Sequence, residues 1–443
     1  MAKSKQKFIC QNCEAVFYKW AGRCENCGEW NSLVEQTLPE VGRSAVARSI
    51  NNGKPLQVNS LNSIPFEEGM KRLKTGIGDL DIILGGGILP GGVTLLAGQP
   101  GIGKSTLLLQ AVSNIAHNYN VLYISGEESS GQVRLRAARL GADKSSNLNF
   151  AASTSADDIA ATIRTGKYQL VVVDSVQTLH LNEITSSPGS ISQITNSSNV
   201  IINAAKETGT SVIFVGHVTK EGSIAGPKIL EHLVDVVLQF EGDRYGGFKI
   251  VRAVKNRYGS TNEAAIFEMG EKGLRIVENP SAALLAERRD EDGSVVLATL
   301  EGARPLLVEI QALVNSTNFG YPKRTASGFD INRLNLLIAV LERRTKLKLS
   351  DKDIYINVVG GIKISDPAAD LAICMAIASA SAGRRLNYDT VVFGEVGLGG
   401  EVRSVTSIEK RIAEAKKLGF TKALAPITIK DDFIIGVDNV RST

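Results

Sequence analysis

The sequence predicts an α/β protein of three modules, and this prediction rests on length, on alternating strands and helices, and on clustered cysteines. The chain has 443 residues, 43% of them hydrophobic and 22% charged, which is the composition of a globular protein with about three domains. From about residue 70, β-branched runs alternate with segments of helical length, a pattern typical of parallel strands joined by crossover helices. Four of the five cysteines lie within residues 10–27, which sets apart a small N-terminal module.

The pattern also predicts where the elements and domains lie. The central module is expected to have strands at 93–97, 121–125, 170–174, 211–216, 234–240 and 248–254, and helices at 106–116, 131–140, 156–165 and 191–208. A third module, of α+β type, is expected to have strands at 294–300, 306–313, 353–359 and 390–394, and helices at 331–345, 366–380 and 407–418. We therefore expect domains at 1–34, 61–275 and 276–443, with a flexible polar linker at 35–60.

Charge and hydropathy exclude some classes of protein. The 50 basic and 46 acidic residues give a net charge of +4, so net charge alone does not argue for nucleic-acid binding. No run of ~18 apolar residues predicts a membrane span, and no apolar segment follows the basic N-terminus as in a signal peptide. Five cysteines are too few for a secreted disulfide scaffold, and Cys374 is expected to be a core residue. The protein is expected to be cytoplasmic.

A phosphate-binding loop is predicted between the first strand of the central module and its first helix. The residues of the motif and of the helix start are Gly98, Gln99, Pro100, Gly101, Ile102, Gly103, Lys104, Ser105 and Thr106. Glycines let backbone N–H groups wrap the β-phosphate at a helix N-terminus, where an anion is favoured. Lys104 would reach the β- and γ-phosphates and Ser105 would bind Mg²⁺. The motif predicts binding of ATP with Mg²⁺.

Acidic residues at the ends of two further strands are candidates for ATP hydrolysis. Asp174 ends an apolar strand and would hold Mg²⁺ through water, although it could instead cap a helix. Glu127 and Glu128 follow another strand, and either could orient the attacking water; the alternative is two solvated acids in a turn. His217 ends a fourth strand and could sense the γ-phosphate or be an ordinary surface or core histidine.

The clustered cysteines predict a zinc site. Cys10, Cys13, Cys24 and Cys27 form two Cys-x2-Cys knuckles, a spacing typical of a tetrahedral four-thiolate Zn²⁺ ribbon. The alternative is reduced free thiols. Such a closed site has no open position for catalysis, so the module is expected to recognise a partner or a DNA fork.

Two motifs carry a resemblance to known families. The run Thr75-Gly76-Ile77-Gly78-Asp79-Leu80-Asp81, followed by Gly85-Gly86-Gly87, resembles the entry to RecA-type ATPase cores. Lys255-Asn256-Arg257-Tyr258-Gly259 resembles the signature of the bacterial RadA (Sms) recombination proteins, in which Phe is the commoner fourth residue. Those proteins also combine a zinc ribbon, a RecA-like core and a Lon-protease-like domain in this order, so the resemblance covers nearly the whole chain.

The resemblance implies a DNA motor. It implies a DNA-dependent ATPase and branch-migration helicase that acts on single-stranded and branched DNA in recombination and repair, as a homo-oligomeric ring, expected to be a hexamer, with the RecA recombinase as a partner. By alignment with RecA cores, Glu127 takes the water-activating position and Asp174 the Walker B position. Lys255 and Arg257 would reach the γ-phosphate of a neighbouring subunit, as an arginine finger does, or contact DNA. Without the resemblance they would be read as a solvated basic turn.

The C-terminal domain resembles the proteolytic domain of Lon but is expected to lack protease activity. Peptide cleavage of this kind needs a serine nucleophile and a lysine base, whereas Ala368 and Glu409 stand at those positions. Ser365 and Lys410 lie nearby but out of register. The domain would then be a scaffold for the ring and for DNA, and its phosphate-contact candidates are Lys323, Arg324, Arg333 and Arg344; the alternative is a solvated basic face.

Two other functions remain open from the sequence. One is an ATP-dependent protein unfoldase or protease. The other is a signalling ATPase with a RecA core that binds proteins and not DNA.

Overall fold

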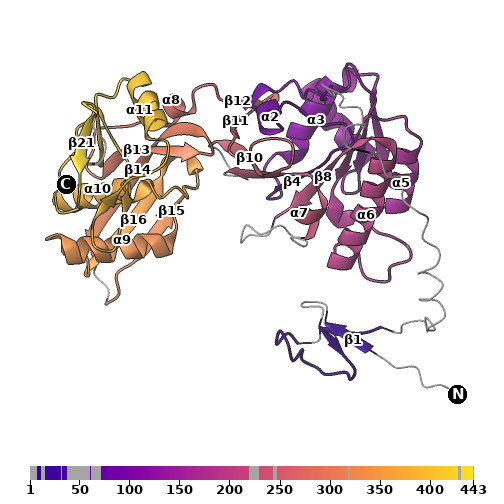
Figure 1. Ribbon diagram of the computed structural model, residues 1–443, viewed down its shortest axis with the longest axis horizontal. Helices are drawn as coiled ribbons and strands as arrows, with labels where there is room; N and C mark the ends of the chain where they lie inside the picture. The colour runs from indigo at the N-terminus through magenta and orange to yellow at the C-terminus, as the bar shows by residue number, and fades with distance from the viewer. Residues whose placement is uncertain are drawn as a thin grey trace. The chain divides into compact units, whose positions relative to one another are not determined.

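The computed structural model describes residues 7–10, 15–30, 32–36, 60, 71–218, 229–242, 247–317, 320–427 and 431–442 (Figure 1). The chain divides into two compact units, Met1–Glu68 and Gly69–Thr443. The predicted linker at 35–60 lies outside the described residues, apart from positions 35, 36 and 60.

The N-terminal unit contains a small antiparallel sheet. Its strands are β1 (Lys7–Cys10), β2 (Val16–Phe17) and β3 (Leu33–Gln36), in the order β2-β1-β3. Cys10, Cys24 and Leu33 form the core, and Phe8, Phe17 and Ala21 pack against it. Two of the predicted metal ligands therefore lie at the centre of the ribbon, where a metal can replace the large core that so short a chain lacks. The last strand runs two residues beyond the predicted end of this domain.

The second unit begins with a nine-stranded sheet of the order β12-β11-β10-β9-β4-β8-β7-β5-β6. Its strands are β4 (Val93–Gly98), β5 (Val121–Ser125), β6 (Leu148–Ala152), β7 (Leu170–Asp174), β8 (Ser211–His217), β9 (Val236–Gly242), β10 (Lys249–Asn256), β11 (Ala264–Gly270) and β12 (Gly273–Ile276). The six strands from β4 to β9 are parallel, and β10, β11 and β12 extend the sheet antiparallel. The predicted mostly parallel α/β sheet is confirmed.

Helices cover both faces of this sheet (Figure 1). The core of one face joins α2 (Gly78–Ile83), α3 (Lys104–Ile115) and α4 (Ser130–Leu140) to the strands, and that of the other face joins α5 (Ala156–Arg164), α6 (Ile191–Thr208) and α7 (Ile229–Leu233). Strand β7 shows why both faces are apolar: Leu170 and Val172 pack on the first face, and Val171 and Val173 on the second. Short 3₁₀ turns, η2 (Ala142–Lys144) and η3 (Val176–Thr178), complete the layers.

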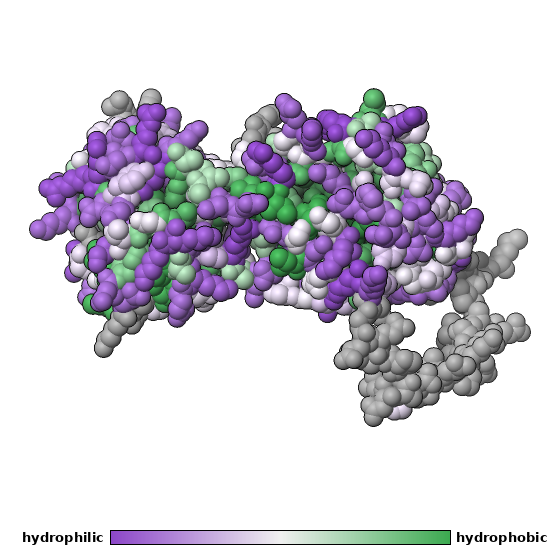
Figure 2. Space-filling model, turned by 90° about the horizontal axis from the view of Figure 1, so that it is seen from above, coloured by the Kyte–Doolittle hydropathy of each residue, from purple (hydrophilic) through white to green (hydrophobic). Residues whose placement is uncertain are grey.

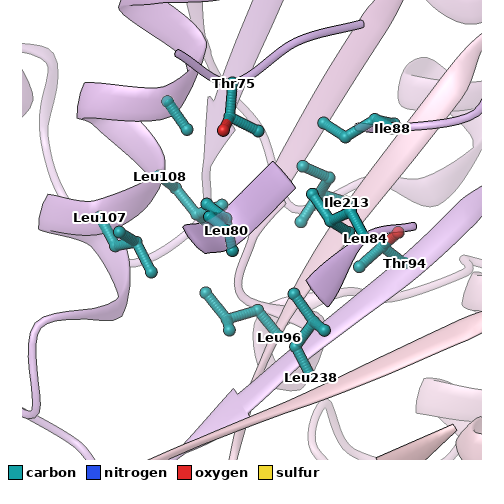
Figure 3. A pocket seen from close by; sticks show the side chains of 11 residues that line it. Thr75, Leu80, Leu84, Ile88, Thr94, Leu96, Leu107, Leu108, Ile213 and Leu238 are labelled. Atoms are coloured by element: carbon teal, nitrogen blue, oxygen red, sulfur yellow. The ribbon is translucent and has the colours of Figure 1, made fainter. Parts of the chain in front are cut away.

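A small void lies inside the first of these cores. Its volume is about 20 Å³, and side chains from α2, α3 and strands β4, β8 and β9 line it, among them Leu80, Leu108, Leu96, Ile213 and Leu238 (Figure 3). The lining is almost entirely aliphatic, so the void is a packing defect and not a ligand site.

The second sheet has seven strands in the order β15-β16-β14-β13-β17-β20-β21. They are β13 (Ser294–Glu301), β14 (Arg304–Ser316), β15 (Arg324–Ser327), β16 (Lys352–Val358), β17 (Thr390–Val392), β20 (Lys422–Pro426) and β21 (Ile434–Val437). The same part of the chain contains the helices α8 (Pro280–Leu285), α9 (Ile331–Arg344), α10 (Ala369–Ala382) and α11 (Ile408–Lys417). It also contains the turn η4 (Val359–Gly361) and the hairpin of β18 (Glu395–Val396) and β19 (Val402–Arg403). The sheet mixes parallel and antiparallel pairs and carries helices, so this part of the chain is the predicted second domain of mixed α and β structure. The predicted domain boundary at 275/276 coincides with the end of β12 and stays a prediction.

No helix of the described ranges is long and apolar enough to cross a membrane. On the face shown in Figure 2, hydrophilic side chains predominate.

Candidate nucleotide site and zinc ribbon

The predicted nucleotide-binding residues lie at one edge of the large sheet. Strands β4, β5, β7 and β8 are parallel, and their register pairs Gly98 with His217 and Ser125 with Asp174. Their carboxyl ends therefore meet, which is where parallel α/β sheets bind ligands. The phosphate-binding loop begins at Gly98, and Glu127 comes two residues after Ser125. Both therefore lie at this edge of the sheet.

The loop between β4 and α3 requires glycine. Gly101 and Gly103 have φ of 77° and 117°, which other residues rarely adopt. A Cβ on Gly98 would lie 2.6 Å from the carbonyl oxygen of Phe240. The helix starts at Lys104, so its first backbone N–H groups border the loop and suit a phosphate group.

Lys104 lies at the centre of the site. Its Nζ donates hydrogen bonds to the carbonyl oxygens of Gly98 and Gln99 at 2.8 and 3.0 Å and lies 3.1 Å from Nδ1 of His217. Burial of the ammonium lowers the pKa of Lys104 to about 8, against the opposing attraction of Asp174 and Glu127. The side chain is therefore partly neutral near pH 8.

Two hydroxyl groups hold Asp174 at the end of β7. Ser105 Oγ donates to Asp174 Oδ2 at 2.7 Å, and Tyr123 Oη donates to the same oxygen at 2.5 Å. Burial and the neighbouring carboxylate raise the pKa of Tyr123. Tyr123 was not among the predicted site residues, although a tyrosine within the buried strand Val121–Ser125 needs a hydrogen-bond partner for its hydroxyl.

The two adjacent glutamates have different partners. Ser175 Oγ donates to Glu127 Oε1, and His217 Nε2 lies 3.0 Å from the same oxygen. Because the Lys104 ammonium can only donate, Nδ1 of His217 accepts and its Nε2–H donates to Glu127. The hydrogen bond from His217 lowers the pKa of Glu127 to about 2, so its carboxylate is ionised. Glu128 instead forms a 2.5 Å ion pair with Arg136 on α4.

Lys255 and Arg257 lie at the opposite end of the sheet from the phosphate-binding loop. Lys255 Nζ donates to the carbonyl oxygens of Glu231 and Val234 at 2.6 and 2.7 Å, next to the end of α7. Arg257 Nη1 lies 3.1 Å from Asp235 Oδ1, and Asp235 Oδ2 accepts from the N–H of Val93, the first residue of β4. That strand is about 16 Å long, so neither cation contacts the loop of its own subunit.

The zinc ribbon brings three of the four predicted ligands together. The Sγ atoms of Cys10, Cys24 and Cys27 all lie within 4.8 Å of one another, and those of Cys10 and Cys27 are 3.6 Å apart. Two sulfurs in a tetrahedral zinc site are about 3.8 Å apart, so the three residues fit the ion. Cys13 lies outside the described residues, and its place in the site stays a prediction.

Replacing one ligand should remove the metal without unfolding the ATPase core. We expect about one Zn²⁺ per chain by metal analysis and much less in Cys24→Ser. The ATPase rate of this variant in the absence of DNA should be retained, because the ribbon and residues Gly69–Thr443 are separate units. The matched control is Cys374→Ser, since Cys374 lies buried in α10, far along the chain from the knuckles. Full zinc in Cys24→Ser would contradict the site.

Structural interactions occupy the region that would hold a protease dyad in the C-terminal domain. Ala368 is buried directly before α10, and its neighbour Asp366 forms a 2.8 Å ion pair with Arg411. Arg411 is fully buried and also donates to the carbonyl oxygen of Ala298 at 2.7 Å. Lys410 donates to a different carbonyl, that of Ala303, at 3.2 Å. This arrangement is a buried structural ion pair, which no motif in the sequence had indicated.

The four basic DNA-contact candidates of this domain differ in their surroundings. Arg333 Nε donates to Oδ1 of the buried Asp370 at 3.0 Å, and its Nη2 donates to the carbonyl oxygen of Val396 at 3.1 Å. The hydrogen bond to Asp370 raises the pKa of Arg333. Arg333 therefore holds α9 against α10. Lys323 is exposed, and Arg324 and Arg344 are half-buried; their contact with DNA stays a prediction.

Comparison with known proteins identifies three segments. Residues 8–35 match a family described as a rubredoxin metal binding domain, residues 69–223 match an AAA domain, and residues 334–429 match subunit ChlI of Mg-chelatase. The first match agrees with the cysteine cluster, and the second covers the phosphate-binding loop, Glu127 and Asp174.

Full-length relatives are also similar. A Bacillus subtilis protein named DNA repair protein RadA is 48% identical over 99% of this chain and 98% of its own length. Proteins of the same name from Pseudomonas aeruginosa and Aquifex aeolicus are 46% and 45% identical, over 96% and 97% of this chain and 94% and 95% of their own. The chain belongs to the RadA family of DNA repair proteins.

Proposed function

We propose that this protein is a DNA-dependent ATPase that moves along single-stranded DNA and drives branch migration of recombination intermediates. The observation that carries the proposal is the meeting of the phosphate-binding loop, Asp174 and Glu127 at one sheet edge, in a chain related over its whole length to DNA repair proteins. ATP and Mg²⁺ would bind at this edge, and the protein would act in the cytoplasm.

Each residue of the edge has a distinct task in this proposal. The backbone N–H groups at the start of α3 and the Lys104 ammonium would bind the phosphates. Mg²⁺ neutralises charge on the β- and γ-phosphates when it is bound. Ser105 and Asp174 would hold the ion, and Glu127 would orient the attacking water. His217 contacts both Lys104 and Glu127, so a phosphate that binds Lys104 can change the hydrogen bond between His217 and Glu127.

The proposed assembly is a homo-oligomeric ring, expected to be a hexamer. Lys255 and Arg257 lie too far from their own loop to contact its nucleotide, whereas Arg257 is 55% exposed and available to a neighbouring subunit. An arginine supplied across an interface would couple hydrolysis in one subunit to the position of the next. In this ring the strand of DNA would pass through the centre, and the RecA recombinase is the proposed partner.

Alternative functions fit less well. A protease would need a nucleophile where buried Ala368 stands, and Arg411 with Asp366 fills that region with an ion pair. A signalling ATPase would share the ATP site, so only its response to DNA separates it from the motor.

The decisive experiment is the ATPase rate of the full chain with and without single-stranded DNA, with denatured casein as the competing activator. The proposal expects stimulation by DNA, no stimulation or cleavage of casein, and ATP-dependent migration of a branched DNA joint. Lys104→Ala is the negative control. Stimulation by casein would favour the unfoldase, and no response to either would favour the signalling ATPase.

Tyr123 is expected to position Asp174 for the metal. In Tyr123→Phe the carboxylate loses the 2.5 Å hydrogen bond and can turn away, so the Mg²⁺ concentration for half-maximal ATPase should rise about 3- to 10-fold, as for loss of one hydrogen bond. The rate at saturating Mg²⁺ should change little. Tyr119→Phe is the control, because Tyr119 lies on the same side of the core without a bond to Asp174. An unchanged Mg²⁺ requirement would contradict this role.

ATP binding should take up protons near pH 8. The pKa of Lys104, lowered to about 8 by burial, should rise when an anionic triphosphate lies beside it. In the free protein about half of the Lys104 side chains are then deprotonated at pH 8, and about a tenth at pH 7. The affinity for ATP should therefore fall as the pH rises through 8. Calorimetry in buffers of different ionisation enthalpy should measure an uptake of about half a proton per ATP at pH 8 and about a tenth at pH 7. Equal uptake at both pH values would contradict the pKa of Lys104 as the cause.

A further inference from the structure

The two tryptophans of the chain lie together on the surface of the zinc ribbon. Trp20 and Trp30 are 62% and 68% exposed, and the sequence contains no others. The small core of the ribbon is built from Cys10, Cys24 and Leu33, with Phe8, Phe17 and Ala21 packed against it. The two largest apolar side chains of this unit are therefore outside its core, and exposed aromatic surface of this kind marks a binding site.

Gly22 lies close to both indoles. A Cβ added to Gly22 would lie 3.9 Å from the ring of Trp20 and 4.0 Å from that of Trp30. The rings thus flank one backbone position that has no side chain. Glycine at this position therefore leaves uncovered an atom of each indole that a side chain would contact.

The metal knuckle sets the position of Trp30. Cys24 and Gly28 close a turn through hydrogen bonds from Cys24 N to Glu29 O and from Gly28 N to Cys24 O, at 2.8 and 2.9 Å. The turn brings Trp30 back opposite Arg23, with which it forms an isolated β-bridge. Because Cys24 and Cys27 belong to the knuckle, the aromatic pair should form only when the metal holds the turn.

A basic group lies beside one of the rings. The Arg23 guanidinium is 5.7 Å from the centre of the Trp30 ring. Arg23 is itself held by a 2.7 Å hydrogen bond from its Nε to the carbonyl oxygen of Gly28, and the residue is exposed. Exposed aromatic rings beside cations are the combination that binds unpaired bases by stacking and the adjoining phosphate by charge.

We propose that Trp20 and Trp30, with Arg23, form a stacking site for unpaired bases of single-stranded DNA. The proposal rests on the DNA-dependent function proposed above and assigns part of the DNA contact to the ribbon. The acids Glu25 and Glu29 balance Lys19 and Arg23 within residues 15–30, so stacking and not net charge should dominate. Binding at this site should therefore weaken only slightly with salt, in contrast to binding through many phosphates.

Intrinsic fluorescence tests the proposal directly, since every tryptophan of the chain lies in the site. A short oligothymidylate added to the full-length protein without nucleotide should quench the emission in a saturable way. Each alanine variant, Trp20→Ala or Trp30→Ala, keeps one tryptophan, whose fluorescence reports the binding. Each should weaken the binding by about 5- to 150-fold, as for loss of one base–aromatic stack. Trp20→Phe and Trp30→Phe keep an aromatic face and should retain most of the affinity. All four variants should hold one Zn²⁺ per chain, which shows that the ribbon is folded.

Parallel ATPase measurements distinguish this proposal from the function on which it rests. If the oligonucleotide stimulates ATP hydrolysis but leaves the fluorescence unchanged, the motor proposal stands and the stacking site is wrong. If it does neither, the DNA-dependent function itself is wrong. Quenching by a recombinase protein in the absence of DNA, with none by the oligonucleotide, would make the aromatic pair a protein-docking surface and overturn the proposal.

Discussion

Glu127→Gln is expected to bind ATP normally but to hydrolyse it about 10²- to 10⁴-fold more slowly, the usual loss when a positioned acid–base group is removed. Glutamine keeps the shape of the side chain and can still accept a hydrogen bond from Ser175 or His217. It has no negative charge with which to polarise a water molecule. The measurements are nucleotide affinity by equilibrium binding and single-turnover hydrolysis of ATP.

The matched control is the same substitution one residue further along. Glu128 pairs with Arg136 at a partly exposed position, and loss of such a pair is worth at most about 1 kcal/mol. Glu128→Gln should therefore change the hydrolysis rate less than about fivefold. If the order of the two variants were reversed, Glu128 and not Glu127 would be the water-activating residue.

Much of the nucleotide site could be predicted because its parts follow strands. The ends of parallel strands share one edge of a sheet, so a motif after β4 and carboxylates at β5 and β7 had to lie close together once the strand order was recognised. The Glu127/Glu128 choice could not be made from the residues alone. It depends on Ser175, His217 and Arg136, which come from separate elements.

Two further contacts could not be predicted, because their partners also come from separate elements. Tyr123 contacts Asp174 across neighbouring strands, 51 residues apart, and Arg333 contacts Asp370 across 37 residues. Periodicity identifies a buried or an exposed face, but it does not identify the partner that a charged side chain finds there. By its spacing Arg333 was a candidate for contact with DNA phosphates, or else part of a solvated basic face, whereas in the fold it pairs with a buried carboxylate.

Strand β6 was missed for a local reason, since Leu148–Ala152 is a half-exposed edge strand. It lacks the continuous apolar run that marked its neighbours. Strands β11 and β12 were not predicted because they follow each other as antiparallel strands, without the intervening helices that marked the parallel strands.

Arg257→Ala is expected to slow ATP hydrolysis by about 10³- to 10⁵-fold, as for loss of an arginine supplied across an interface. The side chain is exposed and has one ion pair, to Asp235, so the variant should fold. Arg275→Ala is the control, since Arg275 is also exposed and paired, with Glu268, but lies on the edge strand β12. It should hydrolyse ATP at the wild-type rate.

Mixing Arg257→Ala with Lys104→Ala subunits then tests whether Arg257 acts on a neighbour. Each variant alone should be nearly inactive, because every site contains one defect. In a randomly mixed ring, about a quarter of the interfaces combine an intact Lys104 with an intact Arg257 from the adjacent subunit, so activity should return on mixing. If Arg257 acted within its own subunit, every site would still carry one defect, and no ratio of the variants would restore hydrolysis. Subunit exchange followed by energy transfer between labelled chains shows that mixed rings have formed, so an inactive mixture of exchanged subunits would refute action between subunits.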